Sequence, residues 1–372
     1  MGEFKTPFRY DYVGSFLRPA KLKQARADYE KGLITKEALK KTEDECILAL
    51  VAKQKELGYH VITDGEFRRA TWHLDFMWGF DGIAHQHTKT GLPFHGEQAM
   101  IDDTYLVGKL SLTKEHPFVE HFRFVKALED ENTVAKQTIP APAQFLAQLV
   151  MPFAAENTRK YYTDDAELVD DLVAGYREVI RQLYAAGCRN LQLDDCTWGM
   201  LVDPRVNLFY GAEGGGVDRI KEAYLNINNR VIEGKPDDLI INTHVCRGNF
   251  HSTYASTGAY NGISEFLFAR ENVNAFYLEF DDERSGGFDP LAKVSGDKKV
   301  VLGLITTKSP KLESKEAVIA RIREAAKYIP LDRLYLSPQC GFASCEIGNK
   351  LTEEEQWAKL ALVKEIAEEV WK

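Results

Sequence analysis

A histidine and a cysteine two residues apart, with a second cysteine far along the chain, are the residues best suited to hold a metal ion. His244 and Cys246 follow one apolar run, Cys340 follows another, and Glu279 ends a third between them. Residues two apart on an extended segment point to the same side. One imidazole, two thiolates and a carboxylate suit tetrahedral Zn²⁺. The alternative is a set of buried thiols and a hydrogen-bonded core histidine, but the position of every member at a predicted strand end favours the metal.

Such a site favours one kind of chemistry. A free thiol has a pKa of about 8.5 and is mostly protonated at neutral pH, hence a poor nucleophile. Coordination to Zn²⁺ removes that proton. Sites that activate water usually carry neutral histidines, which keep the metal more electrophilic. Two thiolates and a carboxylate instead leave a bound substrate thiolate electron-rich, so the residues favour alkyl transfer to sulfur over hydrolysis.

Four further polar residues also follow predicted strands: Ser15, Glu66, Asp194 and Lys308. In an α/β barrel the reactive groups gather at the carboxyl ends of the strands, so we expect these side chains near the metal. The alternative for the acidic residues is that they cap the helices that follow. Asp195 is adjacent to Asp194 and is an alternative for its role.

Apolar runs and amphipathic segments alternate along the whole chain. The runs predict eight strands, at residues 9–16, 60–64, 134–140, 190–194, 239–244, 274–280, 299–305 and 333–337. Helical spacing predicts helices at residues 37–57, 166–186, 219–233, 315–328 and 352–370. This alternation indicates a parallel sheet, and eight units indicate a single (β/α)8 TIM barrel over residues 1–372. Residues 68–131 break the alternation and are expected to form an insertion after the second strand, with β-hairpins over the barrel mouth.

Composition excludes several classes of protein. The chain has 372 residues, of which 44% are hydrophobic, and a formal net charge of −9. Nucleic-acid binding calls for a basic face, so a nucleic-acid partner is not expected. No run approaches the roughly 20 apolar residues of a membrane span, and the start of the chain does not resemble a signal peptide. We therefore expect no membrane partner and a cytoplasmic location, where the six cysteines would stay reduced.

Five short segments give the chain a resemblance to a known family. They are Val-Gly-Ser-Phe at 13–16, Asp-Gly-Glu at 64–66, Gln-Leu-Asp-Asp at 192–195, His-Val-Cys at 244–246 and Ser-Pro-Gln-Cys-Gly at 337–341. In this order they resemble the catalytic barrel of cobalamin-independent methionine synthases, and the chain is most similar to the short, single-barrel members. The resemblance implies a zinc ion held by His244, Cys246, Glu279 and Cys340. It also implies that Ser15, Glu66 and Asp194 hold homocysteine, the two carboxylates at its ammonium group.

The resemblance further implies transfer of a methyl group to the homocysteine thiol, giving methionine, with 5-methyltetrahydrofolate (poly)glutamate as the donor. The family has a histidine after the seventh strand where this chain has Lys308. Lys308 is the catalytic candidate at this position, either as the acid or as the partner of an anionic donor, although an ordinary pKa of about 10.4 makes lysine a reluctant proton source. The alternative is a solvated lysine in a loop. This departure keeps open a methyl-corrinoid donor or another small thiol acceptor. A non-catalytic zinc- and thiol-binding barrel and a metal-free decarboxylase are further alternatives.

Other residues near the predicted site are candidates for substrate contacts. Arg18 or Arg247 is expected to meet a substrate carboxylate, as a forked donor would. The aromatic residues at the start of the insertion are Trp72, His73, Phe76, Trp78 and Phe80. They either form a stacking wall for the methyl donor or pack the insertion against the barrel, and His73 is the substrate-binding candidate among them. His85 and His87 resemble a metal pair by spacing only.

Overall fold

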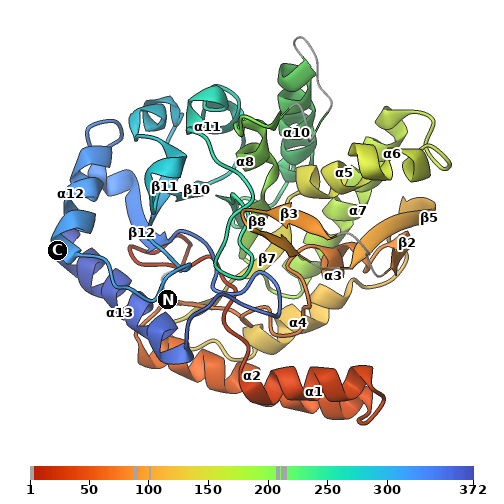
Figure 1. Ribbon diagram of the computed structural model, residues 1–372, viewed down its shortest axis with the longest axis horizontal. Coiled ribbons are helices and arrows are strands. Elements are labelled where there is room, and N and C mark those ends of the chain that lie inside the picture. The colour runs from red at the N-terminus through yellow and green to blue at the C-terminus, as the bar shows by residue number, and fades with distance from the viewer. Residues whose placement is uncertain (1–3, 87–90, 100–101, 207–209, 211–215) are drawn as a thin grey trace.

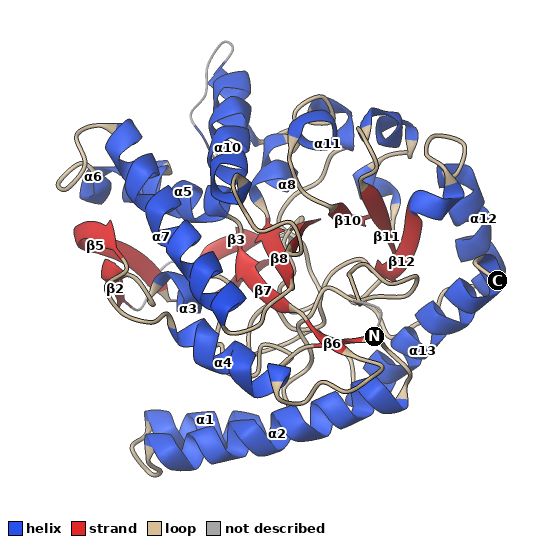
Figure 2. Cartoon of the chain, turned by 180° about the vertical axis from the view of Figure 1, so that it is seen from behind, coloured by secondary structure: helices blue, strands red, loops and turns tan. Residues whose placement is uncertain are grey.

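The computed structural model describes residues 4–86, 91–99, 102–206, 210 and 216–372. Its centre is a six-stranded sheet in the order β12-β11-β10-β9-β8-β7, with every neighbouring pair parallel. A second parallel pair joins β1 to β6, and only Lys136 separates β6 from β7. In Figures 1 and 2 the parallel strands occupy the middle of the molecule and the longer helices lie around them. The fold is therefore α/β with parallel strands, as predicted.

The parallel strands fall close to seven of the eight predicted positions. They are β1 (Val61–Ile62), β6 (Val134–Ala135), β7 (Gln137–Pro140), β8 (Asn190–Asp195), β9 (Ile240–Val245), β10 (Ala275–Glu279), β11 (Lys299–Ile305) and β12 (Leu334–Pro338). Apolar runs of this length between turn residues are typical of strands buried on both faces. The sequence pattern therefore predicted the order of these strands and their ends to within about two residues.

The helices include all five that helical spacing predicted. The twelve α-helices of the described residues are α1 (Ala20–Glu30), α2 (Lys36–Glu56), α3 (Leu74–Met77), α4 (Pro117–Lys126), α5 (Pro142–Val150), α6 (Pro152–Thr158), α7 (Asp165–Ala185), α8 (Thr197–Leu201), α10 (Gly216–Ile232), α11 (Leu267–Arg270), α12 (Lys315–Ala325) and α13 (Glu353–Val370). Side-chain caps fix several starts. Thr352 and Glu355 form a capping box at α13, and Asp164 caps α7.

The predicted first strand, residues 9–16, is wrong as a strand. Only Tyr10 pairs with β12, through a parallel bridge to Leu336. The Asp11 carboxylate accepts hydrogen bonds from the backbone N–H groups of Tyr12 at 2.7 Å and Phe8 at 3.1 Å. These donors are therefore not available to extend a ladder. Asp11 also forms a buried ion pair with the Lys136 ammonium at 3.1 Å. Because Lys136 lies between β6 and β7, this ion pair connects the N-terminal segment to the two parallel sheets.

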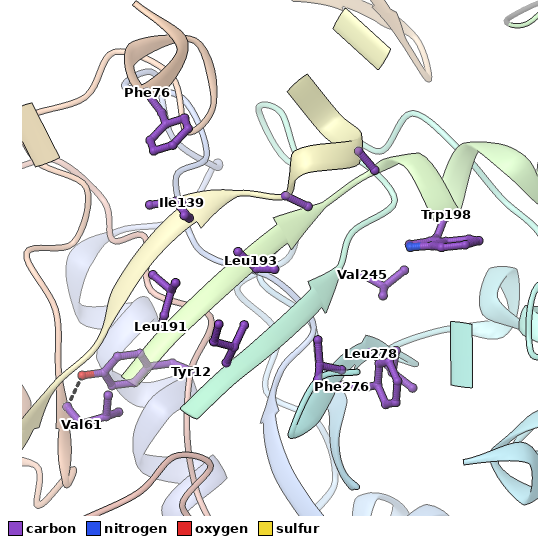
Figure 3. Close-up of a cluster of buried hydrophobic side chains, with 14 of the residues drawn as sticks. Tyr12, Val61, Phe76, Ile139, Leu191, Leu193, Trp198, Val245, Phe276 and Leu278 are labelled. Carbon is purple, nitrogen blue, oxygen red and sulfur yellow. Dashed lines mark hydrogen bonds between the residues drawn. The ribbon is translucent and has the colours of Figure 1, made fainter. Parts of the chain in front are cut away.

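Side chains of the central strands alternate between two faces. Leu191, Leu193, Val245, Phe276 and Leu278 belong to the large buried core that includes the helices, and Figure 3 shows them together beside β8 and β9. The figure also shows Tyr12 donating a hydrogen bond to the carbonyl of Val61. The intervening residues point to the opposite face because strand side chains alternate. That opposite face carries the site described below.

The segment at residues 68–131 contains two antiparallel strand pairs within its described part. β2 (Asp81–Gln86) pairs with β5 (Asp103–Ser111), and β3 (Leu92–Phe94) pairs with β4 (Glu97–Ala99). The helices α3 and α4 flank these strands in sequence. His87, one half of the predicted histidine pair, lies outside the described residues.

None of the helices in the described parts of the chain is long and apolar enough to cross a membrane.

Candidate active site

Three parallel strands bring the four predicted metal ligands together. His244 lies on β9 and Cys246 follows it, Glu279 ends β10, and Cys340 lies two residues beyond β12. One ligand atom from each residue lies within 4.8 Å of the others, and all four residues are buried. The two sulfur atoms are 3.6 Å apart. Residues separated by up to 96 positions in the sequence therefore form one compact cluster.

A glycine on the intervening strand permits this convergence. Gly303 on β11 lies between Glu279 of β10 and Ser337 of β12 in the sheet register. A Cβ atom at Gly303 would lie 2.6 Å from both the Cα of Gln339 and the carbonyl oxygen of Leu278. Such a separation is a clash. A side chain at this position would therefore push apart the strand ends that carry Glu279 and Cys340.

The histidine of the cluster is oriented for metal binding. Its Nδ1 atom lies 3.2 Å from the carbonyl oxygen of Tyr277, to which a protonated Nδ1 donates. That hydrogen bond leaves Nε2 as the basic nitrogen, the arrangement usual for metal-bound histidine. Nε2 of His244 is buried without a hydrogen-bond partner among the described residues. A buried acceptor of this kind is costly unless a cation or donor meets it.

The cluster fits a zinc ion by its chemistry as well as its geometry. A hydrogen bond to Cys196, together with burial, raises the pKa of Cys246 well above its ordinary value, and a hydrogen bond to Cys246 does the same for Cys340. A divalent cation reverses this preference and deprotonates the thiols. Burial alone would raise the pKa of Glu279, but the positive charges of Lys308 and Arg284 lower it to about 2. Two sulfurs, one imidazole nitrogen and an ionised carboxylate form a zinc-type donor set.

Two carboxyl groups lie beside this cluster in the same cavity. Asp194 is the register neighbour of His244 in the sheet, and Glu66 follows β1. Glu66 adopts a left-handed backbone conformation, with φ at 63°, a strain that costs about 1–3 kcal/mol. The Asp64 carboxylate holds this turn by accepting a hydrogen bond from the Glu66 N–H at 2.8 Å. Strain held in this way is typical of functional positions.

Among the described residues, the two carboxyl groups find hydrogen-bond partners for only some of their oxygen atoms. Oε1 of Glu66 accepts hydrogen bonds from Arg69 at 3.2 Å and Thr138 at 3.0 Å, while Oε2 is buried and has no partner among the described residues. Gln192 donates to Asp194 at 2.7 Å. Burial raises the pKa of each carboxyl group to about 7, and in Glu66 the charge of Asp194 adds to the rise. A ligand cation at the free oxygen would favour the ionised forms.

Ser15 and Gly341 approach closely at the edge of the cavity. A Cβ atom at Gly341 would lie 1.9 Å from the Ser15 hydroxyl oxygen. The hydroxyl accepts only a long hydrogen bond, 3.4 Å, from the Ala343 N–H. The Ser15 hydroxyl can therefore form a further hydrogen bond with a ligand.

A cavity of 340 Å³ connects these groups. The predicted site residues that line it are Ser15, Glu66, His73, Asp194, His244, Cys246, Arg247 and Cys340. Its outer wall is apolar and includes Trp72, Phe94, Met151, Phe153 and Phe250. The cavity thus has a polar, metal-ligating floor and an apolar mouth, a combination typical of small-molecule sites.

Of the histidines of the insertion that the structure describes, only His73 lines the cavity. Its ring stacks on Trp72 with centroids 4.5 Å apart, and burial lowers its pKa to about 3, so it is neutral. Phe76 and Phe80 lie in the main core instead. For these two residues the packing alternative holds.

Three of the predicted site residues, Arg18, Glu279 and Lys308, are not among the described residues that line the cavity. The Arg18 guanidinium donates hydrogen bonds to the carbonyls of Phe16, Ala343, Glu66 and Arg69. Its donors face the backbone of the loops that carry Ser15 and Glu66, so the geometry gives it a role in holding these loops. The positive charge of Lys308 acts on Glu279 and Asp281.

Several residues at the site were not predicted from the sequence. Cys196 and Cys345 also line the cavity, and Cys196 shares a hydrogen bond with Cys246. Arg284 donates to Oε2 of Glu279 at 2.7 Å. Cys196 lies two residues after the predicted strand end at Asp194 and directly after β8, so its position near a strand end could have marked it as a candidate. Arg284 lies five residues beyond its strand in an acidic turn, where nothing in the pattern marks it.

Comparison with known proteins gives a consistent family. The model described as "Cobalamin-independent synthase, Catalytic domain" matches residues 154–369. The uncharacterized protein YxjH of Bacillus subtilis is 42% identical over 99% of this chain and 96% of its own length. The crystal structure of the putative vitamin-B12 independent methionine synthase from Listeria monocytogenes is 37% identical, with a TM-score of 0.77 over 100% of both chains. A B12-independent methionine synthase from Shewanella sp. W3-18-1, in complex with selenomethionine, shares the fold at 19% identity, with a TM-score of 0.71 over 97% of both chains.

Proposed function

The chain belongs to the family of cobalamin-independent methionine synthases, and from this premise we propose that it transfers a methyl group to the thiol of homocysteine to give methionine. One observation carries the proposal. His244, Cys246, Glu279 and Cys340 converge within 4.8 Å, and three of them line the cavity that also holds Glu66 and Asp194. A thiol-activating cluster and a pair of acidic groups in one cavity match the two ends of a thiol-bearing amino acid.

The acidic pair recognises the amino group. Oε2 of Glu66 is buried without a partner among the residues described, and the pKa of Asp194 is raised by burial to about 7. An ammonium group between them satisfies the open oxygen and returns both groups to the ionised form. Ser15, whose hydroxyl is free to donate, receives the substrate carboxylate. The side chain of the amino acid then extends toward the cysteines.

The four-residue cluster is the proposed zinc site. A zinc ion there supplies the means to hold a thiol as its thiolate near neutral pH. His244 keeps its Nε2 directed at the ion through the Tyr277 carbonyl. The apolar mouth excludes water from the thiol and accommodates the methyl donor, for which a methylated folate is proposed. The selenomethionine in the Shewanella structure is an analogue of the expected product.

The same proposal extends to architecture. Backbone hydrogen bonds join residues 9–11 to Leu336 of β12 and join Phe16 to Gly65 after β1, at 3.0 and 3.1 Å. We infer that these contacts close the two parallel sheets into one (β/α)8 ring and a single domain over residues 1–372. In such a ring the strand ends converge on the cavity.

The direct test is an assay of methionine formation. Zinc-loaded protein is incubated with homocysteine and, in separate reactions, methylated folate with one or several glutamates, or a methyl-corrinoid. We expect methionine with the folates and its loss in Cys340→Ser. Cys188→Ser, a buried cysteine outside the cavity lining, is the matched control. Methionine formed by Cys340→Ser without zinc would contradict the proposal.

A further inference from the structure

Glu279 differs from the other three ligands of the cluster in being held by a positive charge. Its Oε2 accepts a hydrogen bond from the Arg284 guanidinium at 2.7 Å, and its Oε1 accepts one from the Arg247 backbone N–H at 3.0 Å. The Arg284 side chain is 6% exposed and that of Glu279 0% exposed. Charge-assisted hydrogen bonds between buried groups are among the strong ones. The Glu279 carboxylate is therefore held by one charged donor and one backbone donor.

The surroundings of Arg284 fix the direction of its guanidinium. It donates to Asp281 at 2.7 Å and to Asp282, and it lies over the Tyr254 ring at 5.2 Å. The short helix η2 (Glu283–Ser285) begins with the Asp282 side chain as its cap. Arg284 therefore cannot turn away from Glu279 without breaking these contacts.

The positive charge of a second residue, Lys308, also acts on Glu279. Nζ of Lys308 is buried and has no hydrogen-bond partner among the described residues.

Within the described part of the chain, no arginine or lysine side chain donates a hydrogen bond to either thiol. Sγ of Cys246 accepts a hydrogen bond from the Gly248 N–H at 3.2 Å and lies 3.6 Å from that of Cys340. A cation at Glu279 repels a metal ion and also competes for the lone pairs of the carboxylate. Glu279 is therefore the weakest of the four ligands.

We propose that Arg284 is a positioning residue that holds the Glu279 carboxylate in competition with the metal, and so sets how readily a substrate thiol replaces that carboxylate. The inference rests on the proposed function, because it assigns Arg284 a role toward the zinc site.

The test compares Arg284→Gln, which keeps hydrogen-bonding groups but removes the charge, with Arg284→Lys, which keeps the charge. Zinc affinity is measured by competition with a chromophoric chelator, and homocysteine affinity by calorimetry on the zinc-loaded proteins. We expect Arg284→Gln to bind zinc about tenfold more tightly and homocysteine about tenfold more weakly, with Arg284→Lys close to the wild type. Arg270→Gln, which removes an exposed arginine paired with Glu222, is the matched control.

The outcomes separate the two proposals. If the wild type binds zinc and homocysteine but Arg284→Gln binds zinc equally or more weakly, the inference fails and the proposed function stands. If the wild type binds no zinc, both fail. Thermal denaturation shows whether Arg284→Gln is folded, and Arg284→Lys supplies the comparison if it is not: binding that departs tenfold from wild type in a folded Arg284→Lys overturns the inference.

Discussion

Burial of Glu66 and Asp194 in the cavity disfavours the ionised form of both carboxyl groups. Burial raises the pKa of each to about 7, so near neutral pH a substantial fraction of each is protonated in the free protein. An ammonium group binds only to the ionised forms. If homocysteine binds here as proposed, its ammonium group would favour the ionised forms, and binding would release protons.

The first prediction concerns substrate affinity. We expect the affinity for homocysteine to rise as the pH increases from 6 to 8, because the two carboxyl groups ionise in this window. Asp194→Asn removes one charged hydrogen bond, worth about 1.5–3 kcal/mol, so its dissociation constant should rise roughly 10- to 100-fold. Calorimetry over this pH range measures both effects. Asp170→Asn, at an exposed ion pair with Arg230, is the control. An Asp194→Asn variant with wild-type affinity at pH 8 would exclude the assigned role.

The second prediction concerns stability. The pKa of Glu66 is higher in the folded protein than the unperturbed value of about 4.3. Between these two values the native state holds a proton that the unfolded state has lost, so this group lowers the free energy of unfolding as pH rises from about 4.5 to 7. Glu66→Gln should therefore be more stable than the wild type at pH 8, by about 1–3 kcal/mol, and similar at pH 4.

Urea denaturation at the two pH values measures this difference, and Glu56→Gln, at an exposed glutamate, is its control. A Glu66→Gln variant less stable than the wild type at pH 8 would show that the carboxylate is well compensated in the free protein.

At the scale of elements, the ends of β9, β10 and β12 determine the site. His244 and Cys246 share a face by strand alternation, and this was readable from their spacing alone. The approach of Cys340 to Glu279 depends on Gly303, which lies between their strands. The convergence of the four cluster residues therefore depends on how the strands pack as well as on the residues themselves.

The third prediction follows from that packing. Gly303→Ala places a Cβ atom 2.6 Å from backbone atoms of two neighbouring strands. We expect it to cost about 1–3 kcal/mol of stability and to weaken zinc retention. Melting temperature and metal content after dialysis check this. At Gly262 an added Cβ meets nothing closer than 3.6 Å, so Gly262→Ala is the control. Full metal retention in Gly303→Ala would show that the strand ends converge without the glycine.

The alternation of apolar and amphipathic segments predicted most strands and helices, and the spacing of polar residues at strand ends predicted the cluster. Seven strands, five helices and the four cluster residues lie where the pattern placed them. The first strand failed because the Asp11 side chain takes backbone donors, a local competition that apolar spacing cannot show. Arg18 and Lys308 were assigned by their position beside the strands, but a long side chain can turn to the other side of its loop. Their positions therefore depended on tertiary contacts.

In the molecule as a whole, residues from both ends of the sequence contribute side chains to the site. Ser15 and Cys340 lie at opposite ends of the sequence and line the same cavity. The Lys136 and Asp11 side chains, both fully buried, tie the N-terminal segment to β6 and β7. Removing one partner of such a pair leaves a buried charge uncompensated. The ends of the chain therefore contribute to the site through the fold as a whole.

The central claim is that His244, Cys246, Glu279 and Cys340 hold one zinc ion at which a substrate thiol is activated. X-ray absorption spectroscopy of the zinc-loaded protein tests it most directly. We predict two sulfur and two nitrogen or oxygen neighbours in the free protein, at about 2.3 Å and 2.0–2.2 Å. With homocysteine we predict a third sulfur neighbour in place of an oxygen. A spectrum without sulfur neighbours, or a sulfur count that homocysteine leaves unchanged, would contradict the account.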